Sequence, residues 1–110
     1  MMERMGFVIS LNAGSVGEYK RLHVAVWPEV LDKITDCNIT NYSIFLKEPE
    51  NLLFSYFEYV GADYQADMKK MASDPKTIEW WDICKPCQKP LESRKDGEWW
   101  ATMNEVFHLD

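Results

Sequence analysis

A chain of 110 residues can bury one substantial core but is short for two, so residues 1–110 are expected to form a single domain. Its 12 basic and 18 acidic residues give a formal net charge of -6, which argues against a nucleic-acid partner because such binding needs a basic surface. Its apolar runs are shorter than the roughly twenty residues that span a bilayer. We therefore expect no membrane partner and a cytoplasmic location.

The first third of the chain predicts a strand and then an interrupted helix. Residues 5–12 alternate weakly between apolar and polar side chains and lead into a turn. Ser15 and Glu18 match the capping box that opens a helix, and apolar residues then recur at three- and four-residue spacing. Pro28 falls inside this pattern. Because a proline ring crowds the preceding turn, we expect a kink or a break there.

The middle of the chain predicts a hairpin and a second helix. Residues 39–48 and 52–60 are rich in β-branched and aromatic residues, and a short turn containing Pro49 separates them. Asp63 is expected to cap a helix over about residues 64–72. Alternation along the first strand of the hairpin places three side chains on one face: Tyr42, Ile44 and Leu46.

The last third is predicted to begin with a short helical turn that starts at Pro75 and carries Trp80 and Trp81. Two prolines and a glycine should keep residues 85–98 irregular, and residues 100–110 alternate as a final strand. The resulting order, β-α-β-β-α-β, is the α+β ferredoxin-like arrangement, an antiparallel sheet with helices on one face.

Residues 52–60 offer large apolar side chains to both faces of the predicted sheet. Leu52, Phe54 and Tyr56 alternate with Leu53, Phe57 and Tyr59. A sheet face in water should instead be polar, and both predicted helices already cover the other face. The economical cover is the sheet of a second copy, so the sequence predicts a homodimer.

Cys84 and Cys87 have the C-x-x-C spacing of a thiol redox centre or half a zinc site. A redox pair normally follows a strand at a helix N-terminus, whereas these cysteines follow a tryptophan-bearing helical turn. A structural zinc site needs four ligands, and the remaining candidates are scattered along the chain. We therefore expect incidental loop thiols and no metal.

Tyr19 and His23 lie four residues apart on the apolar face of the first helix, where Tyr42 of the second strand could meet them. Histidine titrates near neutral pH and can give and take a proton, although a histidine on an apolar face can also be a core residue bonded to backbone. The residues alone therefore predict a small α+β domain with a candidate His-dependent proton-transfer site.

Several stretches along nearly the whole chain resemble the L-rhamnose mutarotase family: EYKRLHVAVWPEV (residues 18–30), NYSIFL (41–46), NLLFSYFE (51–58), Trp80-Trp81 and NEVFHLD (104–110). The resemblance implies a dimeric α/β barrel of the ferredoxin-like type. It also implies an isomerase that needs no cofactor and interconverts the α and β anomers of L-rhamnose or a related 6-deoxyhexose such as L-fucose.

By the same resemblance, His23 falls on the catalytic histidine, which would act as the acid that protonates the ring oxygen. Tyr19 and Tyr42 fall on the sugar-binding tyrosines, and Trp80 and Trp81 on a tryptophan pair that would stack on the pyranose. The base is not assigned by the resemblance. Glu105, on the predicted last strand, is a candidate for it.

The sequence departs from the family at Val24-Ala25, directly after the histidine, and over residues 84–100, which leaves the identity of the sugar open. Two alternatives also remain. One is a dimeric α/β-barrel oxygenase or haem-degrading protein, in which His23 and Trp80 would serve a bound macrocycle. The other is a non-catalytic ligand-binding domain of the same architecture.

Overall fold

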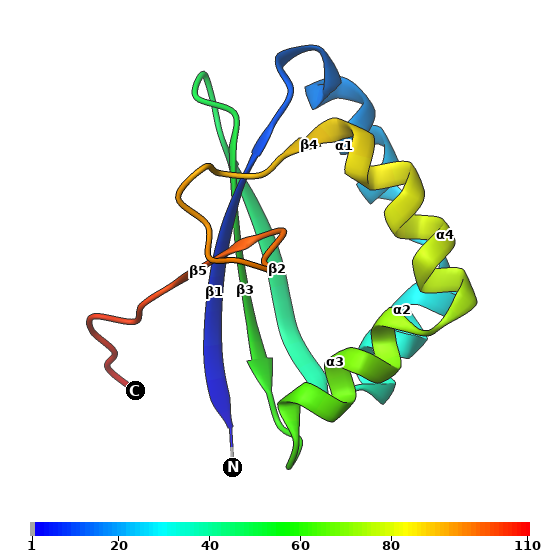
Figure 1. Ribbon diagram of the computed structural model, residues 1–110, viewed down its shortest axis with the longest axis vertical. Coiled ribbons are helices and arrows are strands. Elements are labelled where there is room, and N and C mark those ends of the chain that lie inside the picture. The colour runs from blue at the N-terminus through cyan, green and yellow to red at the C-terminus, as the bar shows by residue number, and fades with distance from the viewer. Residues whose placement is uncertain (1) are drawn as a thin grey trace.

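The computed structural model describes residues 2–110, in which one curled sheet faces an arc of helices (Figure 1). None of the helices in that range is long and apolar enough to cross a membrane. The elements in chain order are β1 (Glu3–Leu11), η1 (Ala13–Ser15), α1 (Val16–Val24), α2 (Pro28–Asp36), β2 (Ile39–Lys47), β3 (Leu52–Tyr59), α3 (Tyr64–Ala72), α4 (Pro75–Cys84), η2 (Lys85–Cys87), β4 (Gln88–Lys89) and β5 (Ala101–Met103).

The sheet is antiparallel, with strand order β2-β3-β1-β4 and with β5 also paired to β1. β1 pairs with β3 along most of its length, from Glu3 opposite Tyr59 to Ser10 opposite Leu52. β2 and β3 form the expected hairpin. The central position of β1 and β3, with β2 at one edge and the last strand at the other, confirms the ferredoxin-like α+β fold.

Pro28 divides the first helical region into two helices, as the sequence predicts. α1 ends at Val24, and α2 begins with Pro28 at its first turn, where the missing amide hydrogen costs nothing. Asp63 caps α3 by accepting a hydrogen bond from the Ala66 amide at 3.1 Å. α4 is longer than the expected helical turn. Asp74 caps its start in the same way, by accepting a hydrogen bond from the Thr77 amide.

The predicted capping box at the start of α1 is wrong. The Ser15 side chain makes no capping hydrogen bond to any described residue, and the Glu18 carboxylate pairs with Arg21 one turn later. The preceding 3-10 turn places Ser15 at φ -107° and ψ 0° rather than in the extended conformation that a capping serine adopts.

The predicted last strand is too long. β5 covers Ala101–Met103 and pairs with Gly6, Phe7 and Val8 of β1, after which the chain leaves the sheet as a tail (Figure 1). Residues 104–110 alternate between apolar and polar side chains, but they pair with no strand of this chain. Three large apolar side chains of the tail are strongly exposed: Val106 (94%), Phe107 (79%) and Leu109 (80%).

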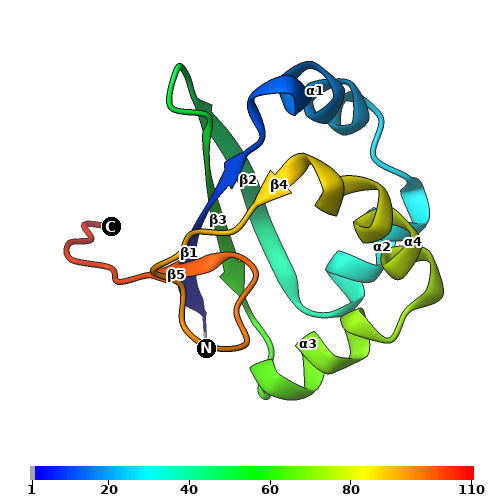
Figure 2. The same ribbon diagram turned by 45° about the horizontal axis from the view of Figure 1, so that its top comes forward.

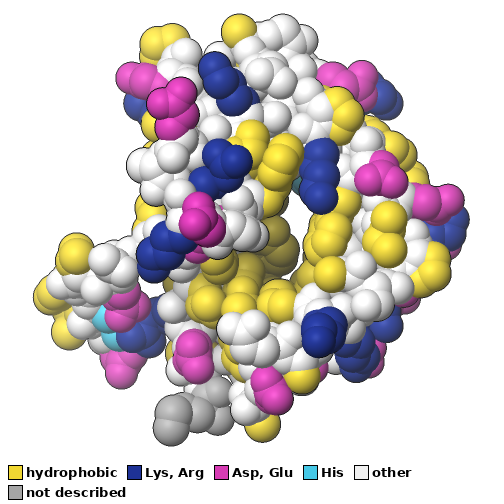
Figure 3. Space-filling view, in the orientation of Figure 1, with side chains coloured by type: hydrophobic (Ala, Val, Ile, Leu, Met, Phe, Trp, Pro, Cys, Tyr) yellow, Lys and Arg dark blue, Asp and Glu magenta, His cyan; other side chains and the backbone are white. Residues whose placement is uncertain are grey.

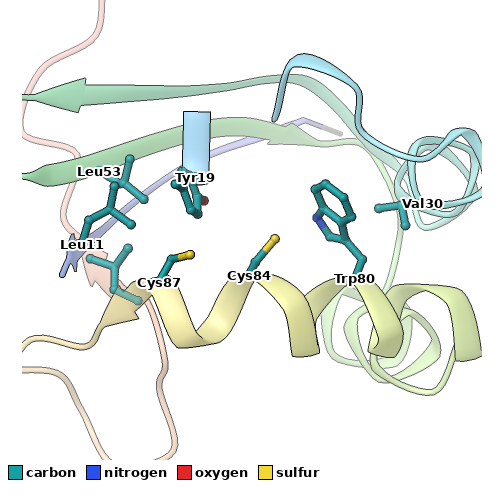
Figure 4. Close-up of a cluster of buried hydrophobic side chains, with 8 residues drawn as sticks. Leu11, Tyr19, Val30, Leu53, Trp80, Cys84 and Cys87 are labelled. Carbon is teal, nitrogen blue, oxygen red and sulfur yellow. The ribbon is translucent and has the colours of Figure 1, made fainter. Parts of the chain in front are cut away.

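The C-x-x-C cysteines are core residues, so the expectation that they lie in a loop is wrong. Cys84 is the last residue of α4 and Cys87 the last of η2, and both are buried with Leu11, Tyr19 and Trp80 between the sheet and the helices (Figure 4). The sequence predicts irregular structure after the tryptophan pair, whereas α4 continues to Cys84 and the 3-10 turn η2 follows it. Cys84, Cys87 and Cys37 are all free thiols.

Candidate active site

A cavity of about 670 Å³ lies between the concave face of the sheet and the arc of helices. The two layers stand apart in Figure 2, and Figure 3 shows hydrophobic side chains gathered around the opening. The volume is in the range that holds a small molecule, and the wall is largely aromatic. All five residues singled out from the sequence line this cavity: Tyr19, His23, Tyr42, Trp80 and Trp81.

His23 and Tyr19 form a stacked pair on α1, with ring centroids 4.2 Å apart and an angle of 23° between the ring planes. Their four-residue spacing brings the rings over one another on the helix face that points to the sheet. The His23 Nδ1 atom lies 2.9 Å from the Tyr19 carbonyl oxygen. A carbonyl can only accept, so Nδ1 carries the hydrogen and Nε2 is the ring nitrogen left for proton exchange.

Burial lowers the pKa of His23 below its ordinary value of 6.5, and the hydrogen bond to the Tyr19 carbonyl offsets part of this effect. Removing water from around the ring disfavours the charged imidazolium. The neutral ring therefore predominates near pH 7, with an unprotonated Nε2. His23 in this state is first a proton acceptor.

A β-bulge in β2 directs Tyr42 into the cavity. The register with β3 shifts between Thr40 and Ser43, and Asn41 takes a φ of 53°, in the left-handed region that asparagine tolerates. Tyr42 then packs edge-on against Phe57, with ring centroids 5.3 Å apart. Tyr42 is 41% exposed because it faces the cavity, yet the surrounding protein raises its pKa to about 12, so its hydroxyl remains a donor.

Trp80 and Trp81 come from α4 and play different parts in the cavity wall. Trp80 is buried, with its ring 5.4 Å from the His23 ring at 66°, and it also packs against Trp27. It holds the imidazole from the side. Trp81 is less buried, and the Lys85 ammonium lies 5.7 Å from its ring centroid.

Among the cavity residues that were not singled out from the sequence are four near the end of the chain: Lys85, Gln88, Trp99 and Trp100. All belong to the segment in which the sequence departs from the family. Gln88 donates to the Tyr19 hydroxyl at 3.3 Å and accepts from the Trp99 indole nitrogen at 2.7 Å. The segment therefore lines the cavity of its own chain. Its irregular pattern gave no periodicity from which these contacts could be predicted, although the tryptophans were a signal.

Glu105 lies outside the cavity. Its carboxylate pairs with Arg4 on the outer side of the sheet, at 2.7 Å and 2.9 Å. Arg4 also lowers the pKa of this carboxyl. Glu105 of this chain is therefore not placed to act as the base in its own cavity.

The described residues of the cavity offer neither a reactive thiolate nor a cluster of metal ligands. Burial raises the pKa of Cys84 to about 12, so the thiol stays neutral at physiological pH. Within residues 2–110 there is no cluster of three His, Cys, Asp or Glu side chains that could hold a metal ion. The titratable groups in the wall are instead an imidazole and phenols.

Together, the half-barrel and its aromatic cavity around one neutral histidine define a small α+β protein with a cavity that can hold a small molecule. The family model for L-rhamnose mutarotase matches residues 4–109. This chain belongs to the L-rhamnose mutarotase family, whose members are isomerases that interconvert sugar anomers.

Relatives named L-rhamnose mutarotase align with nearly the whole chain. The L-rhamnose mutarotase of Opitutus terrae is 36% identical over 99% of this chain and 100% of its own length. That of Oceanobacillus iheyensis is 32% identical with the same coverage. The crystal structure of L-rhamnose mutarotase from Formosa agariphila superimposes with a TM-score of 0.79 and 27% identity, covering 98% of this chain and 99% of that one.

A second solved structure shares the fold at greater distance. A putative antibiotic biosynthesis monooxygenase from Caulobacter crescentus aligns with a TM-score of 0.59 over 82% of this chain and 81% of its own, at 9% identity. At that identity the likeness concerns the fold alone. The oxygenase alternative therefore shares the architecture of this protein. The likeness does not bear on the chemistry of this cavity.

Proposed function

We propose that this protein is a sugar mutarotase that interconverts the α and β anomers of L-rhamnose or a related 6-deoxyhexose such as L-fucose. The observation that carries the proposal is the state of His23. Its Nδ1 hydrogen is committed to the Tyr19 carbonyl, and its Nε2 atom has no hydrogen-bond partner among residues 2–110 while the ring lines an aromatic cavity. That is an arrangement for proton exchange with a neutral ligand.

The reaction moves one proton within the sugar. Nε2 of neutral His23 takes the proton of the anomeric hydroxyl, and the bond between C1 and the ring oxygen breaks to give the aldehyde. The imidazolium then gives the same proton to the ring oxygen. Both oxygens are bonded to C1, so one nitrogen can serve both. Rotation about C1–C2 and reclosure by the reverse steps form the other anomer and return His23 to its neutral state.

The remaining predicted site residues would hold the pyranose in this geometry. The Tyr19 and Tyr42 hydroxyls donate hydrogen bonds to sugar oxygens, since burial raises the pKa of both phenols. Trp81 offers its ring to the apolar C–H face of the sugar, and Trp80 keeps water from the far side of His23. No cofactor is needed for this proton transfer.

Exchange NMR on L-rhamnose and L-fucose tests the function. With the protein present, we expect cross-peaks between the α and β anomeric protons that exceed those of the sugar alone. A faster rate for one sugar identifies the preferred 6-deoxyhexose. No protein-dependent exchange for either sugar, or for a wider set of aldoses, would contradict the proposal.

We also propose a homodimer in which the outer faces of two sheets pack together. Phe45 pairs with Phe54 across the hairpin, and Phe54 pairs with Val8 of β1, so an apolar strip crosses the face away from the helices. Phe45 is 65% exposed. Exposed apolar side chains in the tail add to the surface that a second copy would cover.

Free thiols favour a reducing compartment, so we place the protein in the cytoplasm.

A further inference from the structure

Gln88 stands between the cavity and the segment that follows it. Its side-chain oxygen lies 2.7 Å from the Trp99 indole nitrogen, and its side-chain nitrogen lies 3.3 Å from the Tyr19 hydroxyl. Trp99 is a residue of the irregular segment, Gln88 begins β4, and Tyr19 is buried on α1. Two hydrogen bonds in series therefore connect the segment to the ring that stacks on His23.

The chemistry of the three groups fixes the direction of every bond in this chain. An indole N–H can only donate, so the Gln88 oxygen must face Trp99 and the Gln88 NH2 group must face Tyr19. The NH2 group can only donate, so the Tyr19 oxygen is an acceptor in that contact. The Tyr19 hydrogen is thereby left to donate elsewhere.

The direction in which Tyr19 donates follows from its surroundings. Tyr19 lines the cavity, and burial raises the pKa of its phenol, which keeps the hydrogen in place. Tyr19 donates to no described residue, so the cavity is where an acceptor for its hydrogen can bind. The stacked His23 ring also faces the cavity, which places the donated hydrogen and Nε2 on the same ligand.

Lys85 contacts Trp99, the residue at the outer end of the Trp99–Gln88–Tyr19 hydrogen bonds. Its ammonium lies 5.7 Å from the Trp81 ring centroid and 5.4 Å from that of Trp99, so one cation bridges the cavity wall and the irregular segment. This contact keeps Trp99 over Gln88. Folding of the segment against α4 and the orientation of the Tyr19 hydroxyl are thus linked.

We infer that Gln88 is a positioning residue: the Trp99–Gln88–Tyr19 hydrogen bonds hold the Tyr19 hydroxyl as a donor to a sugar oxygen beside His23. The inference rests on the proposed mutarotase function. It assigns to the segment at residues 85–100 a role in presenting one hydroxyl to the sugar rather than only in closing the cavity.

A double-mutant cycle with anomer exchange as the readout tests the inference. Gln88→Met keeps the side-chain length and removes both hydrogen bonds, and we expect it to lower kcat about fivefold, as for loss of one neutral hydrogen bond. In the Tyr19→Phe background, Gln88→Met should change kcat no further, because no hydroxyl remains to be oriented. Equal losses in both backgrounds would overturn the inference and indicate a merely structural role.

Two further variants sharpen the cycle. Gln88→Glu replaces the amide with a group that only accepts, so Tyr19 would donate to it instead of to the sugar, and kcat should fall at least as far as in Gln88→Met. Glu92→Gln, at an exposed position of the same segment, should leave kcat unchanged. A Gln88→Glu enzyme with wild-type kcat would contradict the assigned direction of the bonds.

The indole N–H resonance of Trp99 gives a readout that does not depend on activity. It is assigned by its loss in Trp99→Phe, and the 2.7 Å bond to Gln88 predicts an upfield shift in Gln88→Met. An unmoved resonance overturns the inference. Absence of anomer exchange in the wild-type protein would instead overturn the proposed function, and the two failures are therefore distinguishable.

Discussion

At the scale of single residues, the cavity chemistry depends on which nitrogen of His23 carries the hydrogen. The Tyr19 carbonyl settles this within one turn of α1, because it lies 2.9 Å from Nδ1. Burial then lowers the pKa of the ring. The acid role expected from the family resemblance requires the imidazolium, which forms in this account only after Nε2 has taken the anomeric proton.

The rate of anomer exchange should therefore depend on pH through the neutral form of His23. Because the folded-state pKa lies below 6.5, the rate should be flat from about pH 7 to about pH 9 and fall as the pH drops through that lower pKa. The pKa of Tyr42, about 12, predicts no alkaline loss in this range.

Exchange rates measured across pH, corrected for the sugar without protein, check this prediction. The His23→Gln variant serves as the control for any pH effect that does not involve the imidazole. An enzyme-dependent rate that rises as the pH falls below 6.5 would show that the imidazolium is the resting form.

Three of the site residues were predictable from periodicity, whereas Trp80 and Trp81 followed only from the family resemblance. The four-residue spacing of Tyr19 and His23 predicts their shared face, and strand alternation predicts that Tyr42 shares a face with Ile44. Gln88 and Trp99 were missed because they follow no period. Their contact joins positions eleven residues apart through an irregular segment, which only the folded chain brings together.

At the scale of elements, helix and strand positions followed from local chemistry, and the errors came where tertiary contacts decide. Pro28 and Asp63 act through the nearest turn, so the break and the cap were predictable. The end of the last strand was not, because alternation is a property of the segment while pairing requires an available neighbour. Burial of the C-x-x-C turn likewise depends on the packing of α4 against the sheet.

Gly61, between β3 and α3, is a position where one methyl group should disturb several elements. A Cβ atom there would collide with the Tyr59 hydroxyl and lie 2.7 Å from the Asp67 carboxylate. Tyr59 donates to Asp67 and accepts from the Asp63 amide, so the crowding strikes the hydrogen bonds that join the strand to the helix. We expect Gly61→Ala to lower the free energy of unfolding by about 2 kcal/mol.

Urea denaturation checks this value, with Gly14→Ala as the matched control. A Cβ atom at Gly14 meets no heavy atom of the described chain within 4 Å, so that variant should stay within about 0.5 kcal/mol of wild type. Equal denaturation midpoints for the two variants would contradict the packing described around Gly61.

At the scale of the whole molecule, the curled sheet has helices on its concave side and an apolar strip on its other side. This is the arrangement that the two-sided pattern of residues 52–60 predicts, with Leu53 and Phe57 buried and Leu52 and Phe54 less so. The proposed second copy would pack on that strip. The sequence predicts that the outer face of the sheet must be covered, because exposed apolar area favours burial. It does not predict how two copies are oriented, because that depends on the detailed shape of the face.

Phe45→Lys should convert the proposed dimer to a monomer, because a charge would then be buried in the apolar strip. Light scattering coupled to size exclusion measures the mass of the variant and of the wild type. Val24→Lys is the control, since Val24 is 86% exposed on α1 rather than on the strip. A wild-type protein that remains monomeric at high concentration would contradict the proposed interface.

In the proposed mechanism, His23 carries a proton between two oxygens of a bound sugar. Exchange NMR on L-rhamnose with wild-type protein and with His23→Gln measures this directly, because the amide is polar and of similar size but cannot shuttle a proton. We predict strong enzyme-dependent exchange for the wild type and a loss of at least about a hundredfold for the variant, whose fold is checked by its unfolding midpoint. Equal exchange in the two proteins would contradict a proton-carrying role for His23.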